Sequence, residues 1–314
     1  NKIKGKNASG ITYEFPANYI ESFLSTLKTS LFASSNNEII EFLNYTTYPN
    51  IREGLKEFKS FLVSGHTKVA DYILHEQFRA ENKSSYQVIP IHEFVKSIAV
   101  ENRHYYNAEI SRIMNLFTTL LDSSDHFISL YLLYDLNDLI ENKQNFSRYV
   151  SSTVIIEKLT NLGYKINTVY DAISKLIKNE LIDSDVVFTD VIWKELKLPS
   201  EFNIGITLKG HYYFKKMLYR FHYYDIVVQD TPIFNDDYFA RMKAIFPESS
   251  ETGKRNVQQK ITLVRQFLLY LRSMENKQSN QAKAVYGLFT ETISESIENE
   301  IKKMPIQASL KVSL

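Results

Sequence analysis

The residues best suited to phosphate chemistry are two Gly-Lys pairs. The pair at 5–6 is followed by asparagine, and the pair at 253–254 is followed by arginine. A phosphate-binding loop needs a glycine further upstream and a hydroxyl residue directly after the lysine, where it ligates Mg²⁺. Both pairs lack these features. We therefore expect this chain to carry no catalytic residue for ATP hydrolysis and to bind neither ATP nor Mg²⁺ by itself.

Metal-ligand patterns are incomplete as well. None of the seven histidines belongs to an H-E-x-x-H motif, although His-Glu pairs occur at 75–76 and 92–93. The chain has no cysteine, which excludes thiolate ligands and disulfides. Two aspartate pairs, at 236–237 and at 183 and 185, are more typical of a helix cap and a polar strand edge. The sequence predicts no metal site.

Composition narrows the class of protein. The 37 Lys and Arg residues nearly balance the 36 Asp and Glu residues, so no overall charge attracts nucleic acid or an anionic membrane. The sequence has no apolar run near the roughly 20 residues that span a bilayer. We therefore expect a cytoplasmic protein with no membrane partner. Only nine Gly and seven Pro occur, which favours helices over a turn-rich β fold.

Apolar residues at helical spacing predict three short helices in residues 1–65. The first covers 16–33, and the second follows a cap at Asn36 or Asn37. The third runs from 51 to 63. Its expected buried side has residues three or four positions apart: Ile51, Leu55, Phe58 and Leu62. We expect a lid-like helical domain over 1–65 and a mostly helical connector over 66–120.

The middle of the chain has the element order helix, helix, helix, strand, strand. Helices are predicted over 125–142 and 151–163, and Asn167 or Thr168 is expected to cap a further helix, VYDAISKLIKNEL. Strand-like runs follow at LIDSDVVF and FNIGIT, and we expect a turn at Gly210 before another helix. Two helices joined by a tight turn and followed by a two-stranded ribbon are typical of a winged helix-turn-helix.

The last third is again helical. Amphipathic segments occur over 236–246, 254–275 and 278–303, and the two long ones suggest an antiparallel hairpin. The sequence therefore predicts a mainly α protein whose winged helix domain covers 121–222 and whose C-terminal hairpin region covers 223–314. The run HYYFKKMLYRFHYYD could pack on this hairpin or on another subunit.

Two stretches resemble parts of a known arrangement. YPNIREGLKEF (48–58) resembles the helical lid of AAA+ and STAND P-loop NTPases, in which an arginine reaches the nucleotide phosphates; Arg52 occupies the matching position. DAISKLIKNELIDSD with ITLKGHYYFKKML resembles a winged helix. A lid followed by a winged helix is similar to origin-recognition-like ATPases and to several bacterial NTPases. The resemblance covers roughly residues 16–220 and lacks the nucleotide-binding core.

The resemblance implies a longer parent protein. Together with the missing initiator methionine, it predicts that this chain is the C-terminal part of an NTPase. ATP and Mg²⁺ would then bind the core of the parent, and Arg52 would sense the nucleotide there. Without such a core, Arg52 would be a solvent-facing residue at the start of a helix.

Candidate binding residues lie on the second helix of the winged helix motif and after its last strand. The helix is expected to present these residues outward, with Asp171 opposing phosphate: Lys165, Asn167, Thr168, Tyr170, Ser174, Lys175 and Lys178. The wing region is expected to add Lys209, His211, Lys215 and Lys216. Residues 157–220 hold ten Lys or Arg and eight Asp or Glu, an excess of two positive charges. DNA binding usually uses several phosphate contacts, so DNA and protein both stay open as targets.

Two functional hypotheses follow. In the first, the chain is the non-catalytic output region of a P-loop NTPase and couples the nucleotide state to double-stranded DNA or to a partner protein. Its protein partners would be its own NTPase core or other subunits. In the second, it is a stand-alone winged-helix regulator or an assembly adaptor.

Overall fold

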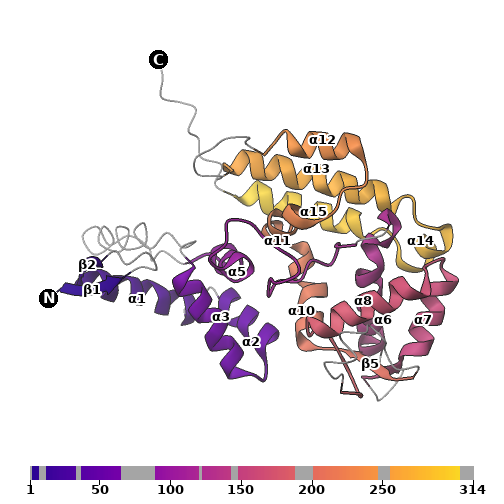
Figure 1. Cartoon of the computed structure of the whole chain (residues 1–314), viewed down its shortest axis with the longest axis horizontal. Coiled ribbons are helices and arrows are strands. Elements are labelled where there is room, and N and C mark those ends of the chain that lie inside the picture. The colour runs from indigo at the N-terminus through magenta and orange to yellow at the C-terminus, as the bar shows by residue number, and fades with distance from the viewer. Residues whose placement is uncertain are drawn as a thin grey trace. The chain divides into compact units, whose positions relative to one another are not determined.

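The computed structural model describes residues 2–6, 12–32, 37–64, 89–119, 122–142, 148–187, 201–246 and 255–304. These residues form a mainly helical protein with small antiparallel sheets (Figure 1). The chain divides into two compact units, Asn1–Arg103 and His104–Leu314, which are described separately. The finer division into four domains stays a prediction.

The N-terminal unit begins with a β-hairpin that the sequence patterns did not predict. β1 (Lys2–Lys6) pairs antiparallel with β2 (Thr12–Pro16). The helices that follow are α1 (Ala17–Phe32), α2 (Glu38–Thr47), α3 (Ile51–Val63) and α5 (Ile91–Val100). The predicted helices over 16–33 and 51–63 agree with α1 and α3 to within one residue at each end.

Three phenylalanines mark the core of the N-terminal unit. The ring centroid of Phe61 on α3 lies 5.0 Å from that of Phe94 on α5, and the ring centroid of Phe42 on α2 lies 5.9 Å from that of Phe94. All three side chains are buried. This cluster fixes which side of α3 faces inward.

The predicted buried side of α3 is wrong. Ile51 is 80% exposed, Leu55 is 65% exposed, and Leu62 is exposed as well. Phe58 is half-buried. Because Phe61 turns toward α5, the stripe of residues three and four positions apart points away from the described core. Periodicity identified an apolar stripe but not which side of the helix its neighbours cover.

Residues 104–119, all of them described, enter the C-terminal unit without a helix, contrary to the predicted mostly helical connector. The amide of Met114 donates to the hydroxyl of Tyr213 at 3.1 Å, and the amide of Leu116 donates to the hydroxyl of Tyr223 at 3.0 Å. The tyrosine hydroxyls accept hydrogen bonds from backbone amides that would donate to backbone carbonyl oxygens if this segment were a helix. Tertiary hydrogen bonds therefore replace local ones in this segment.

The tyrosine-rich run also packs on the C-terminal helices, as one of its two predicted roles required. The ring centroid of Tyr224 lies 6.3 Å from that of Phe267, and the amide of Phe221 donates to the carboxylate of Glu300 at 2.7 Å. Tyr223 and Tyr224 are fully buried. Their side chains belong to the core of this unit.

The next elements form a helix-rich module around a small sheet. They are the 3₁₀ helix η1 (Ser123–Phe127), α6 (Ile128–Glu141), β3 (Val150–Ser151), α7 (Ser152–Asn161), α8 (Ile166–Lys178), β4 (Ile182–Ser184) and β5 (Asn203–Ile206). The sheet is antiparallel with the order β3-β5-β4. The predicted two-stranded ribbon therefore gains a third strand, because Val150 pairs with Ile204.

Gly210 lies inside a helix, and the predicted turn at this position is wrong. Thr207 caps α10 (Leu208–Lys215) by accepting a hydrogen bond from the amide of Gly210 at 3.0 Å. A Cβ atom added to Gly210 would lie 2.0 Å from the carbonyl oxygen of Leu181. The glycine therefore allows α10 to approach the chain entering β4, and it serves no turn.

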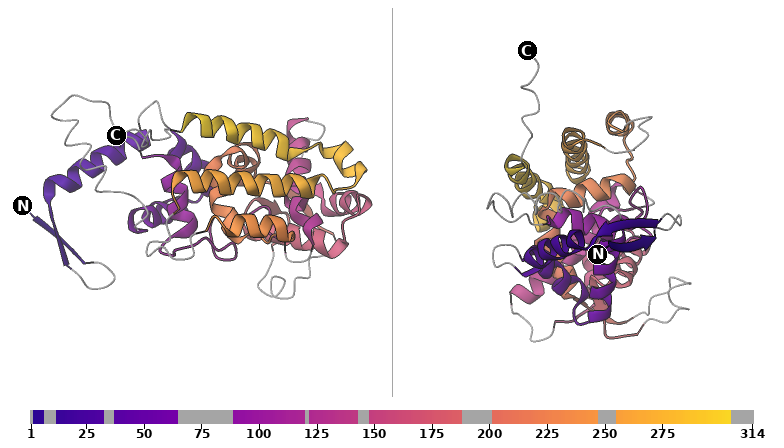
Figure 2. Two further views of the ribbon diagram at one scale, coloured as in Figure 1. Left: turned by 90° about the horizontal axis from the view of Figure 1, so that it is seen from above. Right: turned by 90° about the vertical axis from the view of Figure 1, so that its left-hand side faces the viewer.

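The remaining helices cover the C-terminal part of the chain. They are the short η2 (Met217–Tyr219) and η3 (Val228–Asp230), and α11 (Phe221–Val227), α12 (Asp236–Lys243), α13 (Val257–Glu275), α14 (Asn280–Tyr286) and α15 (Phe289–Lys303). α12 lies beside α13 (Figure 1). The long helices α13 and α15 run side by side, as the left view of Figure 2 shows.

Ion pairs show that α13 and α15 are antiparallel. Arg265 pairs with Glu298 at 2.6 Å, while Arg272, further along α13, pairs with Glu291, earlier on α15, at 2.7 Å. The segment predicted as one helix over 278–303 is divided at Gly287, whose φ of 71° favours glycine. α14 therefore forms the connection between the two long helices.

Candidate nucleic-acid interface

α8 is amphipathic, and its apolar side holds it against α6 and α7. Lys165 occupies the N-cap position with extended backbone, two or three residues before the predicted cap at Asn167 or Thr168, and the helix starts at Ile166. The inward side chains are buried and spaced three or four residues apart: Val169, Ala172, Ile173 and Leu176. This spacing fixes which side chains α8 presents outward.

The outward residues agree only in part with the prediction. Lys165, Asn167 and Lys178 are exposed, and Tyr170 is half-buried. Thr168 and Ser174 were also predicted to point outward, but both are buried. Thr168 faces inward because it lies four positions before the buried Ala172, on the same side of the helix.

Ser174 shows that the outer side of α8 is not uniformly open. Positions 167, 171, 174 and 178 are spaced by four, three and four residues and therefore lie on one side of a helix. Yet Ser174 is only 5% exposed, between the exposed Asn167 and Lys178. The exposed residues of α8 are therefore those of its N-terminal turn together with Lys178, and the residues between are half-buried or buried.

The N-terminal turn contains a residue that the sequence patterns did not single out. Ile166 is 51% exposed, although it is a large aliphatic side chain. Lys165 and Asn167 were both predicted to be exposed. Because Ile166 lies between them at the start of the helix, its exposure could have been predicted as well. The turn therefore offers a cation, an apolar group and an amide together.

Lys175 is less available for phosphate than its type suggests. Its ammonium group lies 2.7 Å from the carboxylate of Asp171, one helical turn earlier. Both side chains are partly exposed, so the pair contributes little to stability. It does neutralise the charge at this point of α8. The cations of α8 that remain for phosphate contacts are Lys165 and Lys178.

The residues predicted for the wing lie on α10 instead. Lys215 pairs with Glu141 at 2.7 Å, and the ring nitrogen Nδ1 of His211 lies 2.9 Å from the amide oxygen of Asn137. Both partners belong to α6. Burial lowers the pKa of His211, and the nearby Lys215 lowers it further. His211 and Lys215 therefore contact α6, and they do not extend the outward side of α8.

The other two residues predicted for the wing, Lys209 and Lys216, also lie on α10 or at its end. The ammonium group of Lys209 lies 3.8 Å from the carboxylate of Glu180, in the turn after α8, and most of its side chain is buried. Lys216, at the end of α10, is exposed. The loop between β4 and β5, where a wing would lie, includes residues 188–200, which are outside the described residues.

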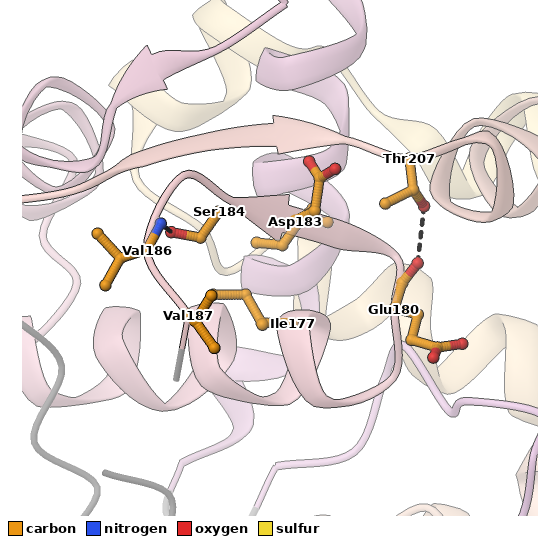
Figure 3. Close-up of a pocket in the computed structure, with 8 residues that line it drawn as sticks. Ile177, Glu180, Asp183, Ser184, Val186, Val187 and Thr207 are labelled. Atoms are coloured by element: carbon orange, nitrogen blue, oxygen red, sulfur yellow. Dashed lines mark hydrogen bonds between the residues drawn. The ribbon is translucent and has the colours of Figure 1, made fainter. Parts of the chain in front are cut away.

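A pocket of about 280 Å³ lies between the end of α8, the turn after it and β4. Figure 3 shows Ile177 and Val187 among the lining residues, and it shows Thr207 donating a hydrogen bond to the carbonyl oxygen of Glu180. The charged groups of the lining, Glu180 and Asp183, are acidic. The lining residues therefore add no positively charged group for phosphate.

Arg52 lies in the first turn of α3, in the N-terminal unit. Asn50 caps this helix by accepting a hydrogen bond from the amide of Glu53 at 3.3 Å. The side chain of Arg52 is exposed, as are those of Lys56 and Lys59. Residues 52, 56 and 59 are spaced by four and three positions, so the three cations form a row along α3 beside its exposed apolar stripe.

The aspartate pairs take structural positions. Asp236 and Asp237 lie in the first turn of α12, whose cap is the side chain of Asn235. Asp183 on β4 pairs with Arg148, and Asp185 accepts hydrogen bonds from Asn203 at 2.8 and 2.7 Å. Among the described residues, no group of three or more His, Asp or Glu side chains is placed to hold a metal ion.

Comparisons with protein-family models, with curated proteins and with solved structures gave no match to this chain. In the parts of the chain that the structure describes, no helix has both the length and the apolar character needed to cross a membrane.

Proposed function

We propose that residues 128–206 form a winged helix that binds double-stranded DNA through α8. The observation that supports this most strongly is the order α6, β3, α7, α8, β4, β5 with a sheet ordered β3-β5-β4, combined with exposed cations at both ends of α8. In helix-turn-helix proteins the second helix of the motif enters the major groove, and its N-terminal residues contact base edges. The N-terminal turn of α8 is its most accessible part.

The spacing of the two exposed lysines suits a groove. Lys165 and Lys178 are thirteen residues apart, which corresponds to about 20 Å along a helix. The major groove is about 12 Å wide, and phosphates line both of its edges. A helix lying across the groove would bring one lysine toward each phosphate backbone. Two such contacts, with a neutral Asp171–Lys175 pair between them, predict modest affinity that decreases with salt.

The N-terminal unit is proposed to be the lid of a P-loop NTPase whose core binds ATP and Mg²⁺. Support comes from α3, whose stripe of exposed apolar side chains includes Ile51 and Leu55. Apolar side chains gathered on one surface favour a covering partner. The adjacent exposed Arg52 and Lys59 would face the phosphate-bearing side of that partner, while Lys56 between them pairs with Glu53. The chain would thus couple the nucleotide state to DNA as a non-catalytic output region.

DNA binding is tested by fluorescence anisotropy with a mixed-sequence duplex at low and moderate salt. We expect binding to weaken as the salt concentration rises. The double variant Lys165→Ala with Lys178→Ala should bind more weakly than the unaltered chain. Matched controls are Lys56→Ala and Lys59→Ala on α3, which should leave it unchanged. Nucleotide coupling is tested in the full-length protein: an ATP analogue should shift DNA affinity, and Arg52→Ala should remove that shift without changing the affinity measured in the absence of nucleotide.

A second function, protein assembly, is favoured by a separate observation. Ile166 and Val154 are each more than half exposed, while Ser174, in the middle of the outer side of α8, is covered. A partly covered, partly apolar surface with a neutralised ion pair suits a protein partner. The same titration separates the two functions, because an adaptor would bind no duplex even at low salt. Ile166→Asp with Val154→Asp would then abolish the association with the partner protein.

A further inference from the structure

The N-terminal turn of α8 carries the chemistry for reading A·T base pairs. Asn167 and Ile166 are adjacent, exposed residues in the first turn of this helix. We infer that Asn167 hydrogen-bonds to an adenine and that Ile166 contacts the methyl group of a neighbouring thymine. This inference rests on the proposed DNA-binding function and names the class of sequence that α8 would select.

The side-chain amide of Asn167 matches adenine in particular. In the major groove adenine presents an acceptor at N7 and a donor at N6, and an asparagine amide supplies one donor and one acceptor to meet both. Guanine presents two acceptors at the same edge, so an asparagine amide cannot satisfy it with two bonds. Asn167 is exposed, so its side chain is available to a base edge.

Ile166 gives the second half of the preference. Ile166 is 51% exposed, and contact with a thymine methyl group would remove part of its apolar surface from water, which favours binding. Cytosine has no methyl group at this position. Tyr170 lies one turn further along the same side and is half-buried.

The charges around this turn argue against G·C reading. Guanine is read most often by Arg or Lys, and the nearest cation, the exposed Lys165, is assigned to a phosphate contact in the proposed function. A carboxylate that could accept from cytosine is present at Asp171, but Lys175 holds it at 2.7 Å. The side chains of Asn167 and Ile166 are therefore the groups of this turn that we assign to base contacts.

The test uses the whole chain and synthetic duplexes. A bound sequence is first selected from a random duplex pool at low salt, and its affinity is then measured after single-base replacements. Replacing the contacted adenine with 7-deazaadenine removes its N7 acceptor, and replacing the thymine with uracil removes its methyl group. A bidentate base contact predicts a loss of about five- to 150-fold for the wrong base pair at the adenine position.

Variants assign the two contacts. Asn167→Ala should lose the preference for adenine at that position but keep salt-sensitive binding to mixed-sequence DNA. Ile166→Ala should become insensitive to the uracil replacement. The matched controls are Asn299→Ala on α15 and Ile140→Ala near the end of α6, both exposed, which should retain the preferences of the unaltered chain.

The outcomes separate this inference from the function on which it rests. Salt-sensitive binding without base preference, a preference for G·C pairs, or an adenine preference that survives Asn167→Ala would overturn A·T reading and leave DNA binding intact. Absence of salt-sensitive binding to any duplex would overturn the proposed function itself.

Discussion

Lys158 on α7 donates a 2.6 Å hydrogen bond to the buried carboxylate of Asp135 on α6. The other oxygen of Asp135 accepts a hydrogen bond from the hydroxyl of Tyr286 on α14 at 2.8 Å. Burial raises the pKa of Asp135, and the hydrogen bond from Lys158 opposes this rise. One acidic side chain therefore joins two helices of the proposed DNA-binding module to the helices at the C-terminus.

Replacing Lys158 should destabilise the fold, because the buried carboxylate of Asp135 would lose its cationic partner. We expect Lys158→Met to lower the free energy of unfolding by about 1–3 kcal/mol, below the range for fully buried pairs because Lys158 is partly exposed. Urea unfolding measures this loss. Asp135→Asn combined with Lys158→Met should cost less than the sum of the two single changes. Strictly additive losses would show that the two groups do not interact.

Glu275 should make stability depend on pH. Its carboxylate is fully buried at the end of α13 and caps α15 by accepting from the amides of Phe289 and Thr290 at 2.7 and 3.0 Å. Burial raises its pKa above the usual 4.5, against these hydrogen bonds. The folded state then holds the proton more tightly than the unfolded chain, so stability is lost as the pH rises from about 4.5 through the folded pKa.

Glu275→Gln isolates this contribution, because glutamine stays neutral. The stability of Glu275→Gln relative to the unaltered chain should increase as the pH rises through that window, as measured by urea unfolding at several pH values. Glu295→Gln, which changes an exposed residue further along α15, is the matched control. A difference that is constant with pH for Glu275→Gln would contradict the raised pKa.

Tyr223 should be required for its hydroxyl as well as its ring. The hydroxyl donates to the carbonyl oxygen of Met114 and accepts from the amide of Leu116, both at 3.0 Å. Tyr223→Phe leaves both buried backbone groups without this partner, and we expect a loss of about 2–4 kcal/mol in the free energy of unfolding. Tyr105→Phe, at an exposed tyrosine, should change stability little. Equal effects of the two changes would refute the anchoring role.

Gly210→Ala should destabilise the C-terminal unit. The added Cβ would lie 2.0 Å from a backbone oxygen of Leu181 and 2.8 Å from a side-chain carbon of Ile206, so α10 or the start of β4 must move. We expect a loss above about 2 kcal/mol. Gly54→Ala on α3 is the matched control, since its nearest contact is the Thr47 hydroxyl at 3.1 Å. Similar melting temperatures for Gly210→Ala and the unaltered chain would contradict the close approach.

Local patterns were sufficient where local forces decide the structure. α3 and α8 were predicted from apolar spacing, and both form near the expected residues. The buried side of α3 was wrong because it depends on where Phe94 and Phe42 lie, which periodicity does not contain. Gly210 suggested a turn because a glycine that permits close packing and one that permits a turn look alike in a sequence.

The candidate site was predictable to a similar degree. Asn167 and Lys178 are exposed as expected, because they lie opposite the apolar stripe of α8. Ser174 lies on the same outward side but is buried in the folded chain, which helical spacing alone did not predict. The α10 residues were assigned to a wing because strand and helix share the run ITLKGHYYFKK. Their contacts with α6 depend on the three-dimensional path of the chain.

The salt dependence of duplex binding tests the central proposal most directly. The logarithm of the association constant should fall linearly with the logarithm of salt concentration, with a slope of about −0.9 for each phosphate contact. Lys165→Ala with Lys178→Ala should reduce the magnitude of that slope by about 2 relative to the unaltered chain, while Lys175→Ala should change it less because Asp171 neutralises Lys175. A chain that binds no duplex at low salt, or a slope that the double change leaves unaltered, would contradict DNA binding through α8.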